Sequence, residues 1–140
     1  MGRILGLDYG SKRVGIAETD DLKIIASPLT TVHSKDVIKY INEYAAKFDL
    51  EAVVVGMPKS LNSKDTDATH LVQQFVNLLR KKISPIQIIL EDERFTSKIA
   101  SQTMIMGGVK KSKRREKGNL DMVSASIILQ SYLDRKAKGF

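Results

Sequence analysis

The fold of this chain is set by its first strands, in the stretch RILGLDYGSKRVGIAETDDLKIIASPL (Arg3–Leu29). Short apolar runs within it predict three strands, over Arg3–Asp8, Val14–Thr19 and Lys23–Leu29. A turn rich in Gly, Ser and Lys separates the first two, and the pair Asp20-Asp21 separates the second from the third. Three short strands joined by tight turns predict an antiparallel meander.

Beyond this stretch the apolar residues take the spacing of helices, interrupted by short runs that indicate buried strands. The predicted strands are Ala52–Val55 and Ile86–Leu90, and the predicted helices are Ser34–Phe48, Asp67–Lys82, Ser97–Met106 and Asn119–Lys136, with Ser34 and Asn119 as N-caps. This order predicts an α/β fold, a mixed sheet made of a three-strand antiparallel meander plus two parallel strands, with helices on both faces. No repeat or linker divides residues 1–140, so we expect a single domain.

Two predicted helices carry a clear apolar face. The helix over Asp67–Lys82 is expected to pack through Leu71, Val72, Phe75, Val76 and Leu79. In the last helix, Asp121 shares a face with Ala125, Ile128 and Tyr132, which places this acid toward the core.

The composition is that of a globular protein, with 42% hydrophobic and 28% charged residues among 140. Cysteine is absent, which excludes disulfides and thiolate metal sites. Neither His33 nor His70 has a partner at zinc-ligand spacing. No apolar run is long enough to span a bilayer and the N-terminus does not resemble a signal peptide, so we expect a cytoplasmic protein without a membrane partner.

The positive charge is concentrated in one segment, KKSKRREK (Lys110–Lys117). This segment has a net charge of about +5, out of +7 for the whole chain. Such a cluster is typical of a surface that binds a polyanion, and the alternative is a solvated loop. The residues expected to contact a nucleic-acid backbone are Lys110, Lys111, Lys113, Arg114 and Arg115.

Three carboxylates stand at positions where a solvated surface charge is not expected. Asp8 and Glu93 each end an apolar strand, and Asp121 lies in the first turn of the last helix. Because sites in α/β sheets form beyond the carboxyl ends of strands, these acids can converge there. Oxygen ligands without His or Cys favour Mg²⁺ or Mn²⁺, and two such ions can activate water and stabilise a leaving oxygen. Individually, each acid also fits a cap, an ion pair or a helix N-terminus.

Glycines and cations surround these acids. Gly6, Gly10 and Gly15 allow either close approach of a phosphate or tight packing and turn geometry. The basic residues Lys12, Arg13 and Arg94 either hold substrate phosphate or balance the charge of the acids.

Four motifs, spaced over nearly the whole chain, resemble the YqgF/RuvX family. They are LGLDYGSKRVGIA (Leu5–Ala17), VVVGMP (Val53–Pro58), EDERFTS (Glu91–Ser97) and LDMVSASIILQSYLD (Leu120–Asp134). The resemblance implies a ribonuclease H-like fold and a catalytic, metal-binding role for Asp8, Glu93 and Asp121. One departure is the loop Ser60–Ser63, where family members commonly carry a glycine.

Members of this family are described as Holliday junction resolvases and as nucleases that mature the end of pre-16S ribosomal RNA. We therefore expect a metal-dependent nuclease, an endo- or exonuclease acting on structured nucleic acid, that processes the 5′ end of pre-16S rRNA in ribosome biogenesis. The alternatives are a junction resolvase in DNA recombination and repair, or a ribosome-assembly factor that binds nucleic acid without cleaving it. The sequence is compatible with a monomer or a homodimer.

Overall fold

The computed structural model describes residues 2–10, 12–20, 25–57, 67–83, 86–92 and 117–137. Its strands and helices follow the order predicted from the sequence. They are β1 (Arg3–Tyr9), β2 (Arg13–Thr19), β3 (Ala26–His33), α1 (Val37–Lys47), β4 (Leu50–Met57), α2 (Asp67–Lys82), β5 (Gln87–Asp92) and α5 (Lys117–Ala137). The expected helix Ser97–Met106 lies outside the described residues.

The strands form one mixed sheet in the order β3-β2-β1-β4-β5. The pairs β1–β2 and β2–β3 are antiparallel, whereas β4 lies parallel to both β1 and β5. The predicted meander plus two parallel strands is therefore confirmed. Because β1, β4 and β5 run in the same direction, their carboxyl ends meet at one edge of the sheet.

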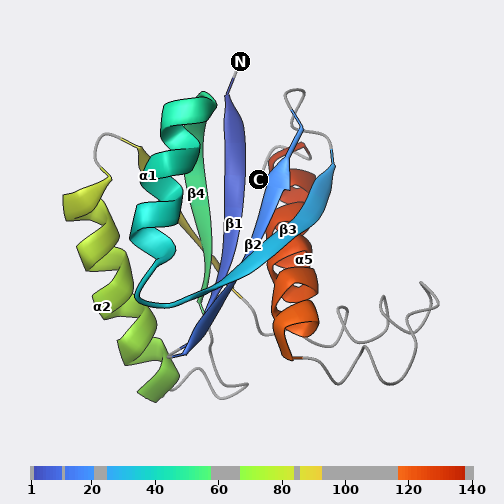
Figure 1. Ribbon diagram of the computed structural model, residues 1–140. Helices are drawn as coiled ribbons and strands as arrows, with labels where there is room; N and C mark the ends of the chain where they lie inside the picture. Colours follow the sequence, from blue (N-terminus) through green and yellow to red (C-terminus); the bar gives the residue numbers. More distant parts are fainter. Residues whose placement is uncertain are drawn as a thin grey trace.

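Helices cover both faces of the sheet, with α1 and α2 on one face and α5 on the other (Figure 1). Alternation along the strands divides the apolar side chains between two cores. In β1, Leu5 and Leu7 point toward α1 and α2, and Ile4 points toward α5. The α5 core is smaller and contains Ala125 and Leu129 of that helix.

Several element boundaries differ from the sequence-based prediction. The helix α5 begins at Lys117, so Asn119, the predicted N-cap, lies inside the helix. The strand predicted from Lys23 begins at Ala26 and continues to His33, because Thr30 to His33 remain paired with β2. The first helix begins at Val37 rather than Ser34. Its N-cap is Asp36, which makes no side-chain capping bond, and a backbone turn precedes it in which Asp36 N donates to His33 O (2.8 Å).

The helix α2 has the predicted bounds, but one residue of its predicted apolar face is misplaced. Val72, Phe75, Val76 and Leu79 are buried as expected, whereas Leu71 is 44% exposed. Leu71 and the equally exposed Leu78 lie seven residues apart, at the solvent edge of the buried stripe. In the part of the chain that the structure describes, no helix is both long and apolar enough to cross a membrane.

Candidate active site

The first carboxylate of the candidate site, Asp8, lies near the carboxyl end of β1. It is directly opposite Gly15 of the antiparallel neighbour β2. Opposed residues in an antiparallel pair share a face of the sheet, and Asp8 alternates with Ile4, which belongs to the α5 core. Asp8 and the bare Cα of Gly15 are therefore presented side by side toward α5.

The second carboxylate comes to the same place because α5 packs directly on Gly15. A Cβ atom added at Gly15 would overlap the backbone carbonyl of Asp121 and lie 2.9 Å from its Cβ. A Cβ at Gly6, on the same face of β1, would lie 2.7 Å from the Cβ of Leu129. These two glycines are thus used for close helix–sheet packing, the second of the two roles that their sequence positions allowed. The contact at Gly15 brings Asp121 to the face that carries Asp8.

Arg13 is the observed partner of Asp121. Its Nε donates to Asp121 Oδ2 at 3.2 Å, and the side chains are 41% and 25% exposed. This distance is longer than the 2.7–2.9 Å or so typical of strong charge-assisted bonds. In this contact Arg13 balances the charge of Asp121, and its expected role in holding substrate phosphate stays a prediction. The sequence placed Arg13 beside the acids but did not indicate which acid it pairs with, and the two members of the pair are 108 positions apart.

The hairpin between β1 and β2 carries the basic residues Lys12 and Arg13. Gly10 N donates to Arg13 O (2.8 Å), and a Cβ at Gly10 would lie 2.8 Å from the same oxygen, so Gly10 serves the turn. Lys12 is exposed, and its carbonyl accepts a hydrogen bond from Ser34 N (3.1 Å).

On the opposite face of the sheet, the ring of Tyr9 stacks on the ring of Phe75 with centroids 4.1 Å apart, which anchors the end of β1.

Several predicted site residues lie outside the described residues, so their positions stay predictions. They are Glu93, Arg94, the loop Ser60–Ser63, and the basic residues Lys110, Lys111, Lys113, Arg114 and Arg115. Within the described ranges, no group of three or more His, Cys, Asp or Glu side chains is placed to hold a metal ion. The described part of the site is the pair Asp8 and Asp121.

One buried acid was not singled out from the sequence. Glu91 of β5 is buried on the α5 side of the sheet, where its Oε2 lies 2.9 Å from Nη2 of Arg135. Gly56 pairs with Glu91 and Leu7 pairs with Val55, so the end of β5 lies at the edge of the sheet that also carries Asp8. The position of Glu91 within the acidic run Glu91–Glu93 was the available signal.

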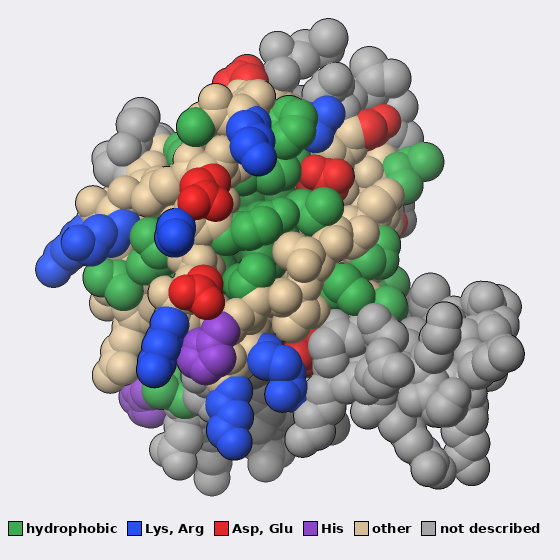
Figure 2. Space-filling model, in the orientation of Figure 1, with side chains coloured by type: hydrophobic (Ala, Val, Ile, Leu, Met, Phe, Trp, Pro, Cys, Tyr) green, Lys and Arg blue, Asp and Glu red, His purple; other side chains and the backbone are tan. Residues whose placement is uncertain are grey.

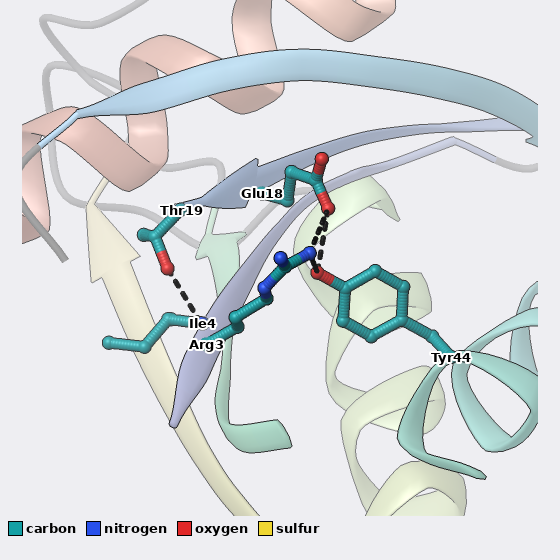
Figure 3. Close-up of polar contacts among 5 residues, drawn as sticks. All are labelled: Arg3, Ile4, Glu18, Thr19 and Tyr44. Atoms are coloured by element: carbon teal, nitrogen blue, oxygen red, sulfur yellow. Dashed lines mark hydrogen bonds and ion pairs between the residues drawn. The ribbon is translucent and has the colours of Figure 1, made fainter. Parts of the chain in front are cut away.

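A second polar cluster lies on the α1 side of the sheet (Figure 3). Tyr44 donates its hydroxyl to Glu18 Oε2 (2.6 Å), and Arg3 Nη1 lies 3.6 Å from the same oxygen. The Arg3 guanidinium also covers the ring of Phe48 at 4.1 Å. Burial raises the pKa of Tyr44 to about 12, with a smaller contribution from Glu18, while Arg3 lowers it. This cluster joins α1 to β1 and β2.

A pocket of about 210 Å³ lies over this cluster, lined also by Leu29 and Tyr40. Figure 2 shows hydrophobic side chains gathered in the middle of this side of the molecule, with acidic and basic side chains around them. Asp8 and Asp121 belong to the α5 side of the sheet, so the pocket is separate from the candidate active site.

Solved structures with the same architecture define the class of fold. The Fowlpox virus resolvase in complex with its substrate Holliday junction DNA has a TM-score of 0.59 at 11% identity, covering 96% of this chain and 98% of that chain. T. thermophilus RuvC in complex with Holliday junction substrate has a TM-score of 0.58 at 14% identity, covering 98% and 96%. The fold is ribonuclease H-like, as the motif resemblance implied.

Sequence comparison identifies the family. A profile described as "RuvX: Holliday junction resolvase" matches residues 2–135, and the chain belongs to this family. It is 49% identical over 133 residues to a protein of Amoebophilus asiaticus, covering 95% of this chain and 94% of that protein. It is 48% identical over 136 residues to a protein of Phocaeicola vulgatus, covering 97% and 98%. Both relatives bear the name "Putative pre-16S rRNA nuclease".

Proposed function

We propose that this protein is a metal-dependent nuclease that hydrolyses phosphodiester bonds in structured nucleic acid and processes the 5′ end of pre-16S rRNA. The observation that carries the proposal is that Asp8 lies directly opposite Gly15 and Asp121 packs onto the same glycine, so that both acids lie between the sheet and α5. The names of relatives that are 49% and 48% identical over nearly their whole lengths support the RNA substrate.

The donor set of the site fits a hard divalent cation. Asp8 and Asp121 both offer carboxylate oxygens, which Mg²⁺ and Mn²⁺ prefer. Glu93 follows β5 by one residue, and β5 ends at the edge of the sheet that carries Asp8, so we assign Glu93 as the third ligand. Bound by these residues, divalent cations supply an activated water and stabilise charge on the leaving oxygen.

Basic residues hold the substrate backbone in this proposal. Lys12 and Arg13 lie on the hairpin beside the acids, and Arg94 directly follows Glu93 in the sequence. The basic loop contributes Lys110, Lys111, Lys113, Arg114 and Arg115. Contacts of lysine and arginine with phosphates give affinity and orientation but little sequence preference. Selection of the cleavage position then depends on the shape of the folded nucleic acid.

Holliday junction resolution is the second candidate, favoured by the description of the family profile that matches residues 2–135. Resolution of a four-way junction requires two symmetrical cuts and therefore a two-fold dimer. Processing of an RNA end requires one active site. The oligomeric state of the active species therefore separates the two candidates.

The test is a cleavage assay on a pre-16S rRNA fragment and a four-way DNA junction, each with Mg²⁺, with Mn²⁺ and with EDTA. We expect metal-dependent cleavage of the RNA that is lost in Asp8→Asn and Asp121→Asn. Asp134→Asn is the matched control, because Asp134 is an exposed acid of the same helix that accepts a hydrogen bond from Gln130. Cleavage in EDTA, or full activity of both site variants, would overturn the proposal. Binding without any cleavage would instead identify a non-catalytic assembly factor.

A further inference from the structure

The contact between Arg13 and Asp121 has the properties of a displaceable ion pair. A single bond of 3.2 Å from Nε holds it, and both side chains are partly exposed to water. Ion pairs of this kind contribute little to stability, because water screens the charges and two long side chains must be held in one geometry. Arg13 can therefore leave Asp121 for an anion that it binds more strongly, at little cost in free energy.

A divalent cation on Asp121 would oppose this contact. The carboxylate charge that attracts the guanidinium would be more than neutralised, and two positive groups would then share one carboxylate. Arg13 and the cation consequently compete for Asp121. Because Arg13 binds Asp121 only weakly, its competition lowers the affinity of the site for the cation only a few-fold. This reduction is compatible with a functional metal site.

Once separated from Asp121, Arg13 is well placed to bind phosphate. Arg13 is the first residue of β2 and lies on the same face of that strand as Gly15, onto which Asp121 packs. The exposed Lys12 precedes it in the chain. The contact with Asp121 uses Nε and leaves the two terminal nitrogens of the guanidinium out of that bond. A guanidinium binds two oxygens of a phosphate at once, so a phosphodiester is a stronger partner than one exposed carboxylate oxygen.

We propose that Arg13 exchanges partners, serving as the counterion of Asp121 in the metal-free protein and as a phosphate ligand once a cation occupies the site. This inference rests on the proposed function, since it takes Asp121 as a metal ligand. Metal and nucleic acid then bind cooperatively, because the cation releases the residue that the substrate needs. By reciprocity, bound nucleic acid tightens cation binding by the same factor.

The first arm of the test measures cation binding alone, as the rise in melting temperature during a Mg²⁺ titration without nucleic acid. Arg13→Gln should bind Mg²⁺ up to about fivefold more tightly than the wild type, because the competitor is gone. Arg13→Lys, which keeps the charge, should remain close to the wild type. Lys12→Gln is the matched control: it removes the same charge one position away without touching Asp121, and should change Mg²⁺ binding less than Arg13→Gln.

The second arm measures the affinity for a labelled pre-16S rRNA fragment by fluorescence anisotropy. Without metal, Asp121→Asn should bind RNA more tightly than Asp8→Asn, although both remove one negative charge, because only the former releases Arg13. This difference should vanish when Arg13→Gln is added to both variants. With Ca²⁺ present to limit cleavage, Arg13→Gln should weaken RNA binding of the otherwise wild-type protein more than it does in EDTA.

The outcomes separate this inference from the proposed function. If Mg²⁺ does not raise the melting temperature of the wild type, the metal site itself is wrong. If Mg²⁺ does so but Arg13→Gln binds it equally well or more weakly, Arg13 does not compete for Asp121 and the exchange is overturned. Equal RNA binding by Asp121→Asn and Asp8→Asn would overturn it as well. The melting temperature of each variant in EDTA verifies that it is folded.

Discussion

Asp8 lies directly opposite Gly15 in the antiparallel pair of β1 and β2, and the space left by the missing side chain of Gly15 is filled by the backbone of Asp121. The distance between the two carboxylates therefore depends on a residue that has no side chain. Any atom added at position 15 must lift α5 away from the sheet at Asp121.

Gly15→Ala is therefore expected to affect both stability and activity. The added methyl group would meet backbone atoms of Asp121, which cannot rotate away, so we expect a loss of about 1–3 kcal/mol or more in the free energy of unfolding. Gly6→Ala is the comparison, because its methyl group would lie 2.7 Å from Leu129 Cβ and 3.0 Å from Ala125 O, which is a less severe overlap than at Gly15. Urea unfolding should show the larger loss for Gly15→Ala. Equal stability of Gly15→Ala and wild type would contradict the packing described above.

Asp8→Asn should separate function from stability. The amide keeps the shape of the side chain and removes one of two like charges, so stability without metal should be unchanged or slightly higher. Mg²⁺ at 100 times its Kd should stabilise the wild type by about 2.7 kcal/mol and the variant by less. Thermal melts in EDTA and in Mg²⁺ measure both effects. If Asp8 were only a structural cap, the variant would lose about 0.5–2 kcal/mol and still cleave.

The raised pKa of Tyr44 predicts that the protein loses stability at high pH. Burial raises its pKa from 10.0 to about 12, so the folded protein holds the phenolic proton more tightly than the unfolded chain does. The stabilisation is fully present below pH 10 and is lost as the pH rises through about 12. The difference in unfolding free energy between wild type and Tyr44→Phe, measured in urea from pH 8 to 12, should shrink over that interval. A difference that stays constant with pH would argue against this assignment.

At neutral pH, Tyr44→Phe also removes the hydroxyl that bonds Glu18 at 2.6 Å. We expect this to cost about 0.5–1.5 kcal/mol, the usual net value of such a bond. Cleavage should be unaffected, because the cluster lies on the α1 side of the sheet and the two acids lie on the α5 side.

Neutralising the basic loop should change how nucleic-acid binding depends on salt. Replacing Lys110, Lys111, Lys113, Arg114 and Arg115 with glutamine should reduce the slope of log K against log salt by up to about 0.9 for each phosphate of duplex DNA that the loop no longer neutralises. The matched control neutralises an equal number of exposed lysines on or beside α1 and α2, namely Lys35, Lys39, Lys47, Lys81 and Lys82. Titrations at several salt concentrations measure both slopes. Equal changes in the two variants would mean that the loop is only a solvated connection.

The sequence predicted the sheet well because the relevant signals are local. The turn at Gly10 and the apolar runs on either side of it are sufficient to predict the first hairpin, and α2 was predicted with its observed bounds. The start of α1 was missed because Ser34 resembles an N-cap, yet the chain first makes a backbone turn. Leu71 was misplaced because its exposure depends on what α2 packs against, which the spacing of residues does not reveal.

The candidate site was predicted only in part for the same reason. Alternation along a strand predicts that Asp8 lies on the same face as Ile4. Residue spacing along a helix predicts that Asp121 faces the core. The pairing of Arg13 with Asp121 depends instead on the angle at which α5 crosses β2, and on Gly15, which allows the close approach. The role assigned to Glu93 remains a prediction of the motif resemblance and of the direction of β5.

The packing of α5 on the first hairpin also has a consequence for the order in which the protein is made. Arg13 and Asp121 are 108 positions apart, so a ribosome completes the hairpin long before it adds the helix that finishes the site. Until then, the apolar residues Ile4 and Ala17 on that side of the sheet lack the helix that buries them. A nascent chain without α5 therefore leaves this apolar surface exposed to water, and Asp8 and Asp121 come together only when α5 docks on the sheet.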